Sequence, residues 1–246
     1  PEAFEEMIWK HFWPDHYRDD HIRPWQSGDQ NPEFDAFFET HMQKVLALHR
    51  AERTNGKDAP SLRYVSKNNL NISRLGARPP SLRSGTLLIP FRTPVQQAAS
   101  MHKQHQRFLE LHAEDSFVRE YMEAIGHHEF GKGLKPVNFN NWLDDATAPP
   151  DSLAFWLRYW TAAYRFIAEQ TDETDVLVSY ARLTNDPEAA LTDLAETLGM
   201  ESAHLTDQAN DLRPPRTHEA DTDDVPASLL QKAETLYKRL QQRSAV

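Results

Sequence analysis

Arg92 and Ser100 are two residues whose types and spacing suit an anion site. Arg92 ends the apolar run TLLIPF (86–91), and Thr93-Pro94 then opens a predicted helix that carries Ser100 two turns in. Ligands of open α/β sheets bind at the carboxyl ends of strands, where an Arg fork and a hydroxyl can both reach one anion. Arg suits phosphate because its planar donors bind bidentately. The spacing therefore predicts an anion site, although an ordinary strand-to-helix turn would leave the same pattern.

A second phosphate motif is suggested just upstream by Arg83-Ser84-Gly85-Thr86. A phosphate-binding loop runs from strand to Gly-rich turn to helix, so that backbone N–H groups point at the anion. Here the turn follows a loop and precedes a strand. We therefore interpret it as an ordinary turn into the strand.

The distribution of charge also favours an anionic ligand. The chain has 27 basic and 37 acidic residues, a formal net charge of −10, which argues against nucleic acid as a partner. From Ala59 to Leu109 there is no Asp or Glu. This stretch carries Arg63, Lys67, Arg74, Arg78, Arg83, Arg92, Lys103 and Arg107. Such a stretch would attract an anion, and a solvated basic face is the alternative.

Cysteine usage and hydropathy narrow the class of protein. There is no Cys, so disulfides and thiolate metal sites are excluded, as expected in a reducing compartment. No apolar run approaches the roughly 20 residues of a membrane-spanning helix, and no signal-peptide pattern opens the chain. We expect no membrane span and a cytoplasmic protein.

The chain contains 12 histidines, so we consider whether some of them form a metal site. His102, His105 and His112 share one predicted helix, and His127-His128 follow it. No carboxylate stands among His102 and His105 at ligand spacing, so we expect polar packing or anion contact and no metal.

The periodicity predicts an α/β protein with a mainly parallel sheet. Strands are expected at 62–66, 86–91 and 175–180. Helices are expected in the opening residues, from Asn31-Pro32, over 94–112, 116–125 and 152–170, after Asp186-Pro187, and over 227–243. Residues 69–75 are expected to form a helical turn, the ARPPSLRSG run a loop, and residues 126–150 a lid-like loop. No linker divides the chain, so we predict one domain over residues 1–246.

Three segments, in the same order, resemble the sulfotransferase family that uses 3′-phosphoadenylyl sulfate, and its bacterial members most. They are YVSKNNLNISRL, LLIPFRTPVQQAAS and VLVSYARLTNDPEAALTDLAETLGM, within roughly residues 62–112 and 150–200. The resemblance implies a P-loop-NTPase-like parallel sheet flanked by helices and a bacterial source. It implies sulfuryl transfer from this co-substrate to a hydroxyl or amine of a small-molecule or glycan acceptor, without a metal.

Roles follow from the family's motifs residue by residue. Arg92 and Ser100 would bind the 3′-phosphate, and Tyr180 would contact the nucleotide. Lys67 would stabilise charge on the bridging oxygen during transfer. The acceptor-side base would come from Glu2, Glu5, Glu6, His11 or His16; the spacing selects none of them, and a solvated helix face is the alternative for each. Phe155, Trp156 and Trp160 would line an acceptor pocket or the core, and Arg213 and Arg216 would close over the nucleotide or face solvent.

The chain departs from the family at two places. The family's first strand and its phosphate loop, which binds the 5′-phosphosulfate, are missing, so we expect an N-terminally incomplete domain or a degenerate member. Ala181-Arg182 stands where the family has Glu-Asp. The alternative is a catalytically silent nucleotide-binding module of the same fold. A kinase-like enzyme would need a Gly-Lys-Ser/Thr loop, which is not evident.

Overall fold

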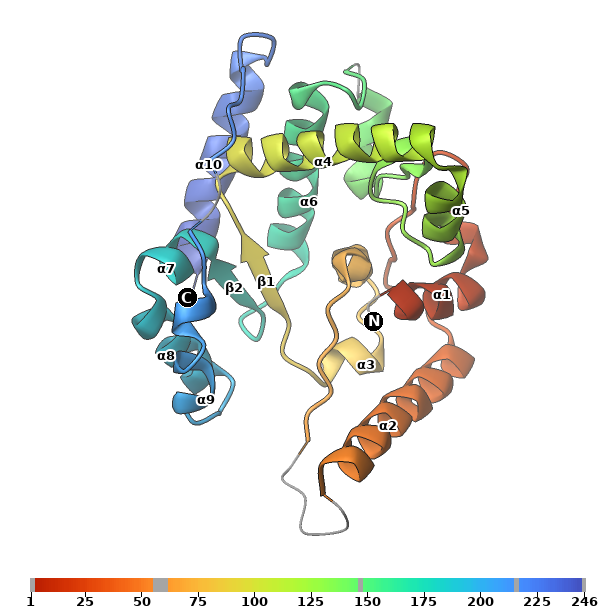
Figure 1. The fold of residues 1–246 in the computed structure, drawn as a ribbon, viewed down its shortest axis with the longest axis vertical. Coiled ribbons are helices and arrows are strands. Elements are labelled where there is room, and N and C mark those ends of the chain that lie inside the picture. The colour runs from red at the N-terminus through yellow and green to blue at the C-terminus, as the bar shows by residue number, and fades with distance from the viewer. Residues whose placement is uncertain (1–2, 55–61, 146–147, 215–216, 245–246) are drawn as a thin grey trace. The chain divides into compact units, whose positions relative to one another are not determined.

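The structure is a computed structural model that describes residues 3–54, 62–145, 148–214 and 217–244 (Figure 1). Backbone contacts divide the chain into two compact units, each described by itself. Unit 1 comprises Pro1–Gly85, Asp115–Glu129 and Gly133–Val137, and unit 2 comprises Thr86–Glu114, Phe130–Lys132 and Asn138–Val246. Within the described residues, no helix is long and apolar enough to cross a membrane.

Unit 1 is helical, and side chains cap the starts of α2 and α5. Its helices are α1 (Ala3–Phe12), η1 (Pro14–His16), α2 (Pro32–Thr54), η2 (Asn69–Arg74), α3 (Pro80–Arg83) and α5 (Ser116–Ala124). The Asn31 side chain accepts from the N–H groups of Glu33 and Phe34 at the start of α2. Asp115 does the same for Phe117 at the start of α5. Such caps satisfy N–H groups that the first helical turn leaves unpaired.

Two predictions in unit 1 are wrong. Residues 62–66 form no strand; their side chains instead attach the segment to α1, where the hydroxyls of Tyr64 and Ser66 both donate to Glu5. The segment predicted as a plain loop after Gly76 contains the short helix α3, which Pro80 opens with its fixed φ.

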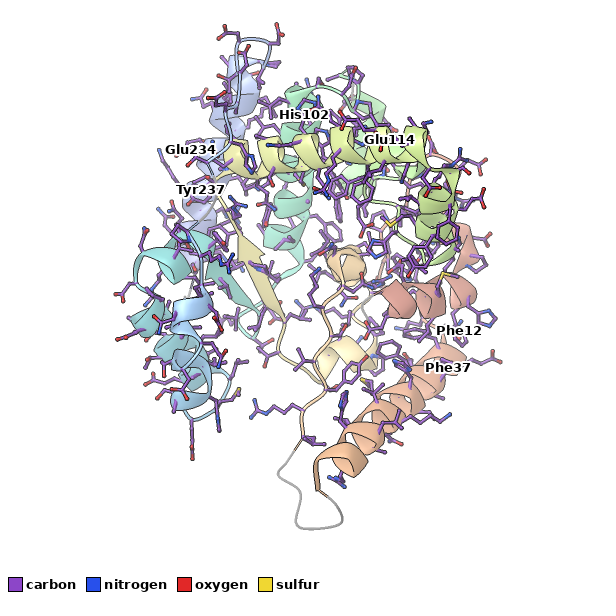
Figure 2. All side chains as sticks on the ribbon, in the orientation of Figure 1. Phe12, Phe37, His102, Glu114, Glu234 and Tyr237 are labelled. Carbon is purple, nitrogen blue, oxygen red and sulfur yellow. The ribbon has the colours of Figure 1, made fainter. Side chains whose placement is uncertain are left out.

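An aromatic core joins α1 to α2. The Trp9 ring lies 4.2 Å from Phe34 and 5.4 Å from Trp13, measured between centroids. Phe12 and Phe37 lie 5.6 Å apart at the edge of this core (Figure 2). Burying large rings at this junction supplies the main apolar contribution to the stability of unit 1.

The most deeply buried charge in unit 1 is Arg74. Its side chain is 0% exposed and that of Glu6 is 4% exposed. Arg74 Nη2 donates to both carboxylate oxygens of Glu6, at 2.9 and 2.7 Å, and Nη1 donates to Asn71 at 2.9 Å. The guanidinium also lies 4.1 Å from the Trp9 ring centroid. A buried ion pair of this kind holds together only while both partners are present.

We therefore expect Arg74→Ala to lower the free energy of unfolding by about 3–5 kcal/mol, because it leaves Glu6 buried without its cation. The matched control is Arg119→Ala, which breaks an exposed pair with Glu123 (2.9 Å) and should cost about 0.5 kcal/mol. Urea unfolding of both variants measures the difference. Equal costs for the two variants would contradict this account.

Unit 2 contains the sheet. Its elements are β1 (Leu88–Phe91), α4 (Pro94–Glu114), η4 (Phe139–Asp145), α6 (Leu153–Gln170), β2 (Val176–Ser179), α7 (Tyr180–Asn185), α8 (Pro187–Thr197), α9 (Ala203–Thr206), η5 (Ala209–Asp211) and α10 (Ala227–Arg243), while η3 (Gly131–Gly133) spans a unit boundary. The predicted strands at 86–91 and 175–180 and the predicted helices of this unit are confirmed. The short α7, α9 and η5 were not predicted.

Strands β1 and β2 pair in parallel, in the register Leu88↔Val176 to Phe91↔Ser179. The Leu87 carbonyl accepts from the Val176 N–H. Because every second residue of a strand directs its N–H and C=O groups toward the same neighbour, Ile89 and Phe91 face β2 and the backbone groups of Pro90 point away from it. Pro90, which has no N–H, therefore interrupts no bond between these strands. The prediction of a helix-rich α/β fold with parallel strands is confirmed among the described residues. The finer prediction of a P-loop-like sheet stays a prediction.

Helix α6 provides the core of unit 2. Trp156 and Trp160 are each 1% exposed and Phe155 is 4% exposed, so these aromatics are core residues. Each indole has a partner: Trp156 donates to the Pro150 carbonyl at 2.7 Å and Trp160 to Gln97 Oε1 at 3.0 Å. Tyr237 of α10 (Figure 2) packs against Phe91 of β1, with 5.8 Å between the ring centroids.

Buried histidines hold the turn at Gly131. The Gly131 N–H donates to His105 Nδ1 at 3.0 Å and the Lys132 N–H donates to His112 Nδ1 at 3.2 Å. Gly131 has φ +73, and a Cβ there would lie 2.7 Å from the His112 ring, so only glycine fits. His105 is 4% exposed. Burial lowers its pKa from the usual 6.5, and nearby His102 adds to the effect.

The free energy of unfolding should therefore decrease as the pH is lowered. Burial also lowers the pKa values of His16 and His128. In the unfolded chain these rings take up protons below about pH 6.5, whereas in the folded protein their lowered pKa values keep them neutral to lower pH. Their contribution to the free energy of unfolding is therefore complete above about pH 6.5 and declines below it. We expect the free energy of unfolding to fall between about pH 6.5 and 5. His105→Asn, which keeps an acceptor but does not titrate, should flatten the fall. Urea unfolding at several pH values measures this dependence, and His204→Asn, on the exposed helix α9, is the control. If the free energy of unfolding falls with the same slope against pH in both variants, the account is refuted.

Candidate functional site

A pocket of about 520 Å³ lies in unit 2 beside the carboxyl ends of β1 and β2. We call it the anion pocket. Its lining residues are Arg92, Ser100, Lys103, Gln104, Arg107, Tyr180, Arg213, Pro214, Thr217 and His218. The volume is in the range of pockets that hold small molecules and cofactors. Three of the four predicted site residues, Arg92, Ser100 and Tyr180, line it.

The strand register places Arg92 beside Tyr180. Phe91 and Ser179 are partners in the last rung of the parallel pair, so the next residues of both strands leave the sheet at the same edge. The Arg92 guanidinium carbon lies 5.0 Å from the centre of the Tyr180 ring. This cation–π contact orients the guanidinium while leaving its N–H donors available to a ligand.

A hydrogen bond fixes the strand end behind Arg92. The hydroxyl of Tyr164, on α6, donates to the Pro90 carbonyl at 2.8 Å. Burial raises the pKa of Tyr164 to about 12, against the opposing effects of its hydrogen bond with Gln97 and of the positive charge on Arg92. The neutral hydroxyl therefore remains a donor at physiological pH and holds the residue before Phe91 in place.

Helix α4 contributes one face to the pocket. It begins at Pro94, next to the end of β1 (Figure 1). Ser100, Lys103, Gln104 and Arg107 line the pocket, and their spacing of three, four and seven residues puts them on one side of a helix. The opposite side carries the buried Ala98, His105 and His112, which explains why the polar stripe faces outward into the pocket.

The remaining wall comes from the chain after η5. Arg213, Pro214, Thr217 and His218 line the pocket. The Tyr180 hydroxyl donates to the Arg213 carbonyl at 3.1 Å, and the Gln96 side chain pairs with the backbone of His218. Arg213, for which a role over the nucleotide was one interpretation, lies at the pocket; Arg216 lies outside the described residues.

The electrostatics of the pocket favour an anion. Four of its ten lining residues are Arg or Lys, and none is Asp or Glu. Among ion pairs between described residues, none involves Arg92, Lys103, Arg107 or Arg213. Lys103 and Arg107 are like charges four residues apart on a helix, an arrangement that is unfavourable without an anion. In a protein of net charge −10, this pocket is a local region of positive potential.

Sequence reasoning missed part of this wall. Lys103 and Arg107 were counted in the acid-free stretch but not assigned to the site, and Gln104, Thr217 and His218 were not considered. The helical spacing from Ser100 was a usable signal for the α4 residues. Nothing in the sequence placed Thr217 or His218 in the same pocket as Ser100, because these residues lie more than 110 positions apart in the chain.

Lys67, the predicted catalytic residue, belongs to unit 1. Its side chain is exposed. Both of its neighbours in the chain are attached to α1: Ser66 donates to Glu5, and Asn68, which also caps η2, donates to Glu6 at 2.8 Å. Its catalytic role stays a prediction.

The suggested acceptor-side bases of unit 1 have different surroundings. Glu6 is paired with Arg74 and is 3% exposed, and His16 is stacked on Trp25, with 4.1 Å between the ring centroids. Both therefore serve the core of unit 1. Glu5 accepts from the hydroxyls of Tyr64 and Ser66, so its carboxylate is engaged in hydrogen bonds within unit 1. Glu2 lies outside the described residues.

The histidines of α4 are engaged in hydrogen bonds. His102 (Figure 2) donates to the Asp151 carbonyl at 2.7 Å, and His105 and His112 accept from Gly131 and Lys132. No group of three or more His, Asp or Glu side chains placed to hold a metal is present among the described residues.

Comparison with models of known protein families, with curated proteins and with solved structures gave no match to this chain. We therefore infer a function from the residues and geometry of the anion pocket, together with the resemblance of the three sequence segments.

Proposed function

We propose that the anion pocket binds the 3′-phosphate of an adenine nucleotide and that the chain is a sulfotransferase. Its co-substrate is 3′-phosphoadenylyl sulfate, and its acceptor is a hydroxyl or amine of a small molecule or glycan. The observation that carries the proposal is that Arg92, Ser100 and Tyr180, taken from two different sequence motifs, line one pocket that contains four Arg or Lys residues and no Asp or Glu. A chance resemblance in either motif would not require this proximity.

The pocket residues have chemistry that suits a phosphate monoester. Arg92 offers a planar pair of N–H donors for two phosphate oxygens. The hydroxyl of Ser100 donates to a third oxygen. Lys103, Arg107 and Arg213 add positive potential without a defined direction. The Tyr180 ring provides an apolar face next to Arg92, suited to the ribose or base of the nucleotide.

The reaction itself needs positioning and charge stabilisation. The acceptor oxygen or nitrogen forms a bond to sulfur while the bond from sulfur to the bridging oxygen breaks, and adenosine 3′,5′-bisphosphate leaves. The acceptor proton passes to a base. Lys67, by its place in the family's motif, stabilises the negative charge that develops on the bridging oxygen. As in phosphoryl transfer, in-line alignment of the reactants is the main requirement.

The second candidate is a nucleotide-binding module without transferase activity. It is favoured by one specific observation: the sequence contains no element like the family's 5′-phosphosulfate loop. Both candidates share the 3′-phosphate site, and they differ in whether the sulfuryl group is transferred.

Calorimetric titration tests the shared site. Adenosine 3′,5′-bisphosphate should bind at least tenfold more tightly than 5′-AMP, since the extra phosphate gains a charge-assisted pair worth about 1.5–3 kcal/mol. Arg92→Ala should remove that preference. Arg107→Ala should weaken both nucleotides by a similar factor and reduce the salt dependence of binding, because its contribution is general potential.

A control for charge is Arg165→Ala on α6, an exposed residue paired with Glu169 at 2.8 Å, which should change neither affinity. If the wild-type chain binds the two nucleotides equally, or if Arg92→Ala weakens them equally, the 3′-phosphate assignment is refuted.

The transferase step has its own measurement. Incubation with 3′-phosphoadenylyl sulfate and a panel of hydroxyl and amine acceptors should release adenosine 3′,5′-bisphosphate. Lys67→Ala should lower this rate at least tenfold and leave the affinity for the bisphosphate unchanged, because Lys67 acts on the leaving oxygen. Nucleotide binding without acceptor-dependent release would favour the silent module, and an unchanged rate in Lys67→Ala would remove Lys67 from the mechanism.

A further inference from the structure

Gln96 holds one side of the anion pocket without lining it. It lies on α4 one turn before Ser100. Its Nε2 donates to the His218 carbonyl at 3.1 Å, and its Oε1 accepts from the His218 N–H at 2.7 Å. One side-chain amide thus satisfies both backbone groups of His218, in the two-bond pattern by which peptide groups pair. These bonds join α4 to a segment 122 residues later in the chain.

A second attachment point lies at Tyr180. Its hydroxyl donates to the Arg213 carbonyl at 3.1 Å while its ring contacts Arg92. Arg213-Pro214 and Thr217-His218, which we call the rim, are therefore tied to the pocket at two places. The rim residues are all pocket-lining residues, so these ties set the shape of that wall.

The rim has little other structure to hold it. The described residues between Leu212 and Pro226 form no helix or strand. Ordering such a segment at the moment of binding costs conformational entropy, and ordering it beforehand removes that cost from the binding step. Both sets of hydrogen bonds are made to backbone groups of the rim, so they fix the backbone of the rim independently of its side chains.

We infer that Gln96 is a positioning residue for ligand binding, which holds the rim, and Arg213 with it, against the anion. The inference rests on the proposed function, because it takes the bound anion to be the nucleotide phosphate. Gln96 itself touches no ligand in this arrangement. It acts through His218 and the rim. Replacing Gln96 should therefore remove the contribution that Arg213 makes to the binding affinity.

The test uses the full chain and adenosine 3′,5′-bisphosphate as the probe. Gln96→Met keeps the length and helix propensity of the side chain but removes both hydrogen bonds. We expect about tenfold weaker binding, from two hydrogen bonds of ordinary net strength, mainly through faster dissociation. Gln106→Ala, exposed on the same helix, is the matched control and should bind like the wild type.

Coupling to Arg213 separates positioning from a general loss of structure. In the wild type, Arg213→Ala should weaken binding severalfold. In the Gln96→Met background the same change should add less than twofold, while Arg92→Ala should retain its full effect. In the unliganded protein, Gln96→Met should also speed hydrogen exchange of the His218 amide, and Gln106→Ala should not.

The outcomes distinguish the two proposals. If the wild type shows no preference for the bisphosphate over 5′-AMP, the proposed function fails and this inference falls with it. If the wild type shows the preference but Gln96→Met binds as tightly, the positioning role alone is refuted. Full additivity of Gln96→Met with Arg213→Ala would refute it as well.

Discussion

The parallel pairing of β1 with β2 is the constraint on which the candidate site depends. Its register ends at Phe91 opposite Ser179, so the chain leaves both strands at one edge and puts Arg92 next to Tyr180. Each residue then leads into a helix, α4 or α7, and α4 carries Ser100, Lys103 and Arg107 along the same wall. A shift of one residue in the register would separate Arg92 from Tyr180 and from the rim that Tyr180 holds.

The charges of this protein are used in two ways. In unit 1, Arg74 is fully buried and each of its terminal nitrogens has a partner, so its charge serves the stability of the core. In unit 2, Arg92 contacts the Tyr180 ring and forms no ion pair with a carboxylate among the described residues, so its donors remain available to the ligand that we propose. The same residue type thus stabilises one unit and lines the proposed binding site in the other. The difference lies in whether an acid is supplied from within the chain.

The helices predicted from Asn31-Pro32, over 152–170 and after Asp186-Pro187 are confirmed. Asn31, Ser152 and Asp186 each cap the helix that follows, and α10 covers the predicted residues 227–243. These features succeed because a cap and an amphipathic stripe act within a few residues of each other. The strand predicted at 62–66 failed because strand formation needs a partner from elsewhere in the chain. In the structure that segment is attached to α1 through its side chains, because the Glu5 carboxylate accepts from Tyr64 and Ser66.

The sequence by itself determined the longer helices, such as α2, α4, α6 and α10, the two strands, and the residue types at the strand ends, including Arg92 and Tyr180, because each depends on neighbouring residues. Only the tertiary structure decided that these two meet, that Lys103 and Arg107 share their pocket, and that Gln96 holds His218. It also decided that Glu6 belongs to the core with Arg74. Contacts of this kind join segments separated by tens to more than a hundred residues. They form because packing and strand pairing bring the segments together, and no local pattern in the chain encodes that approach.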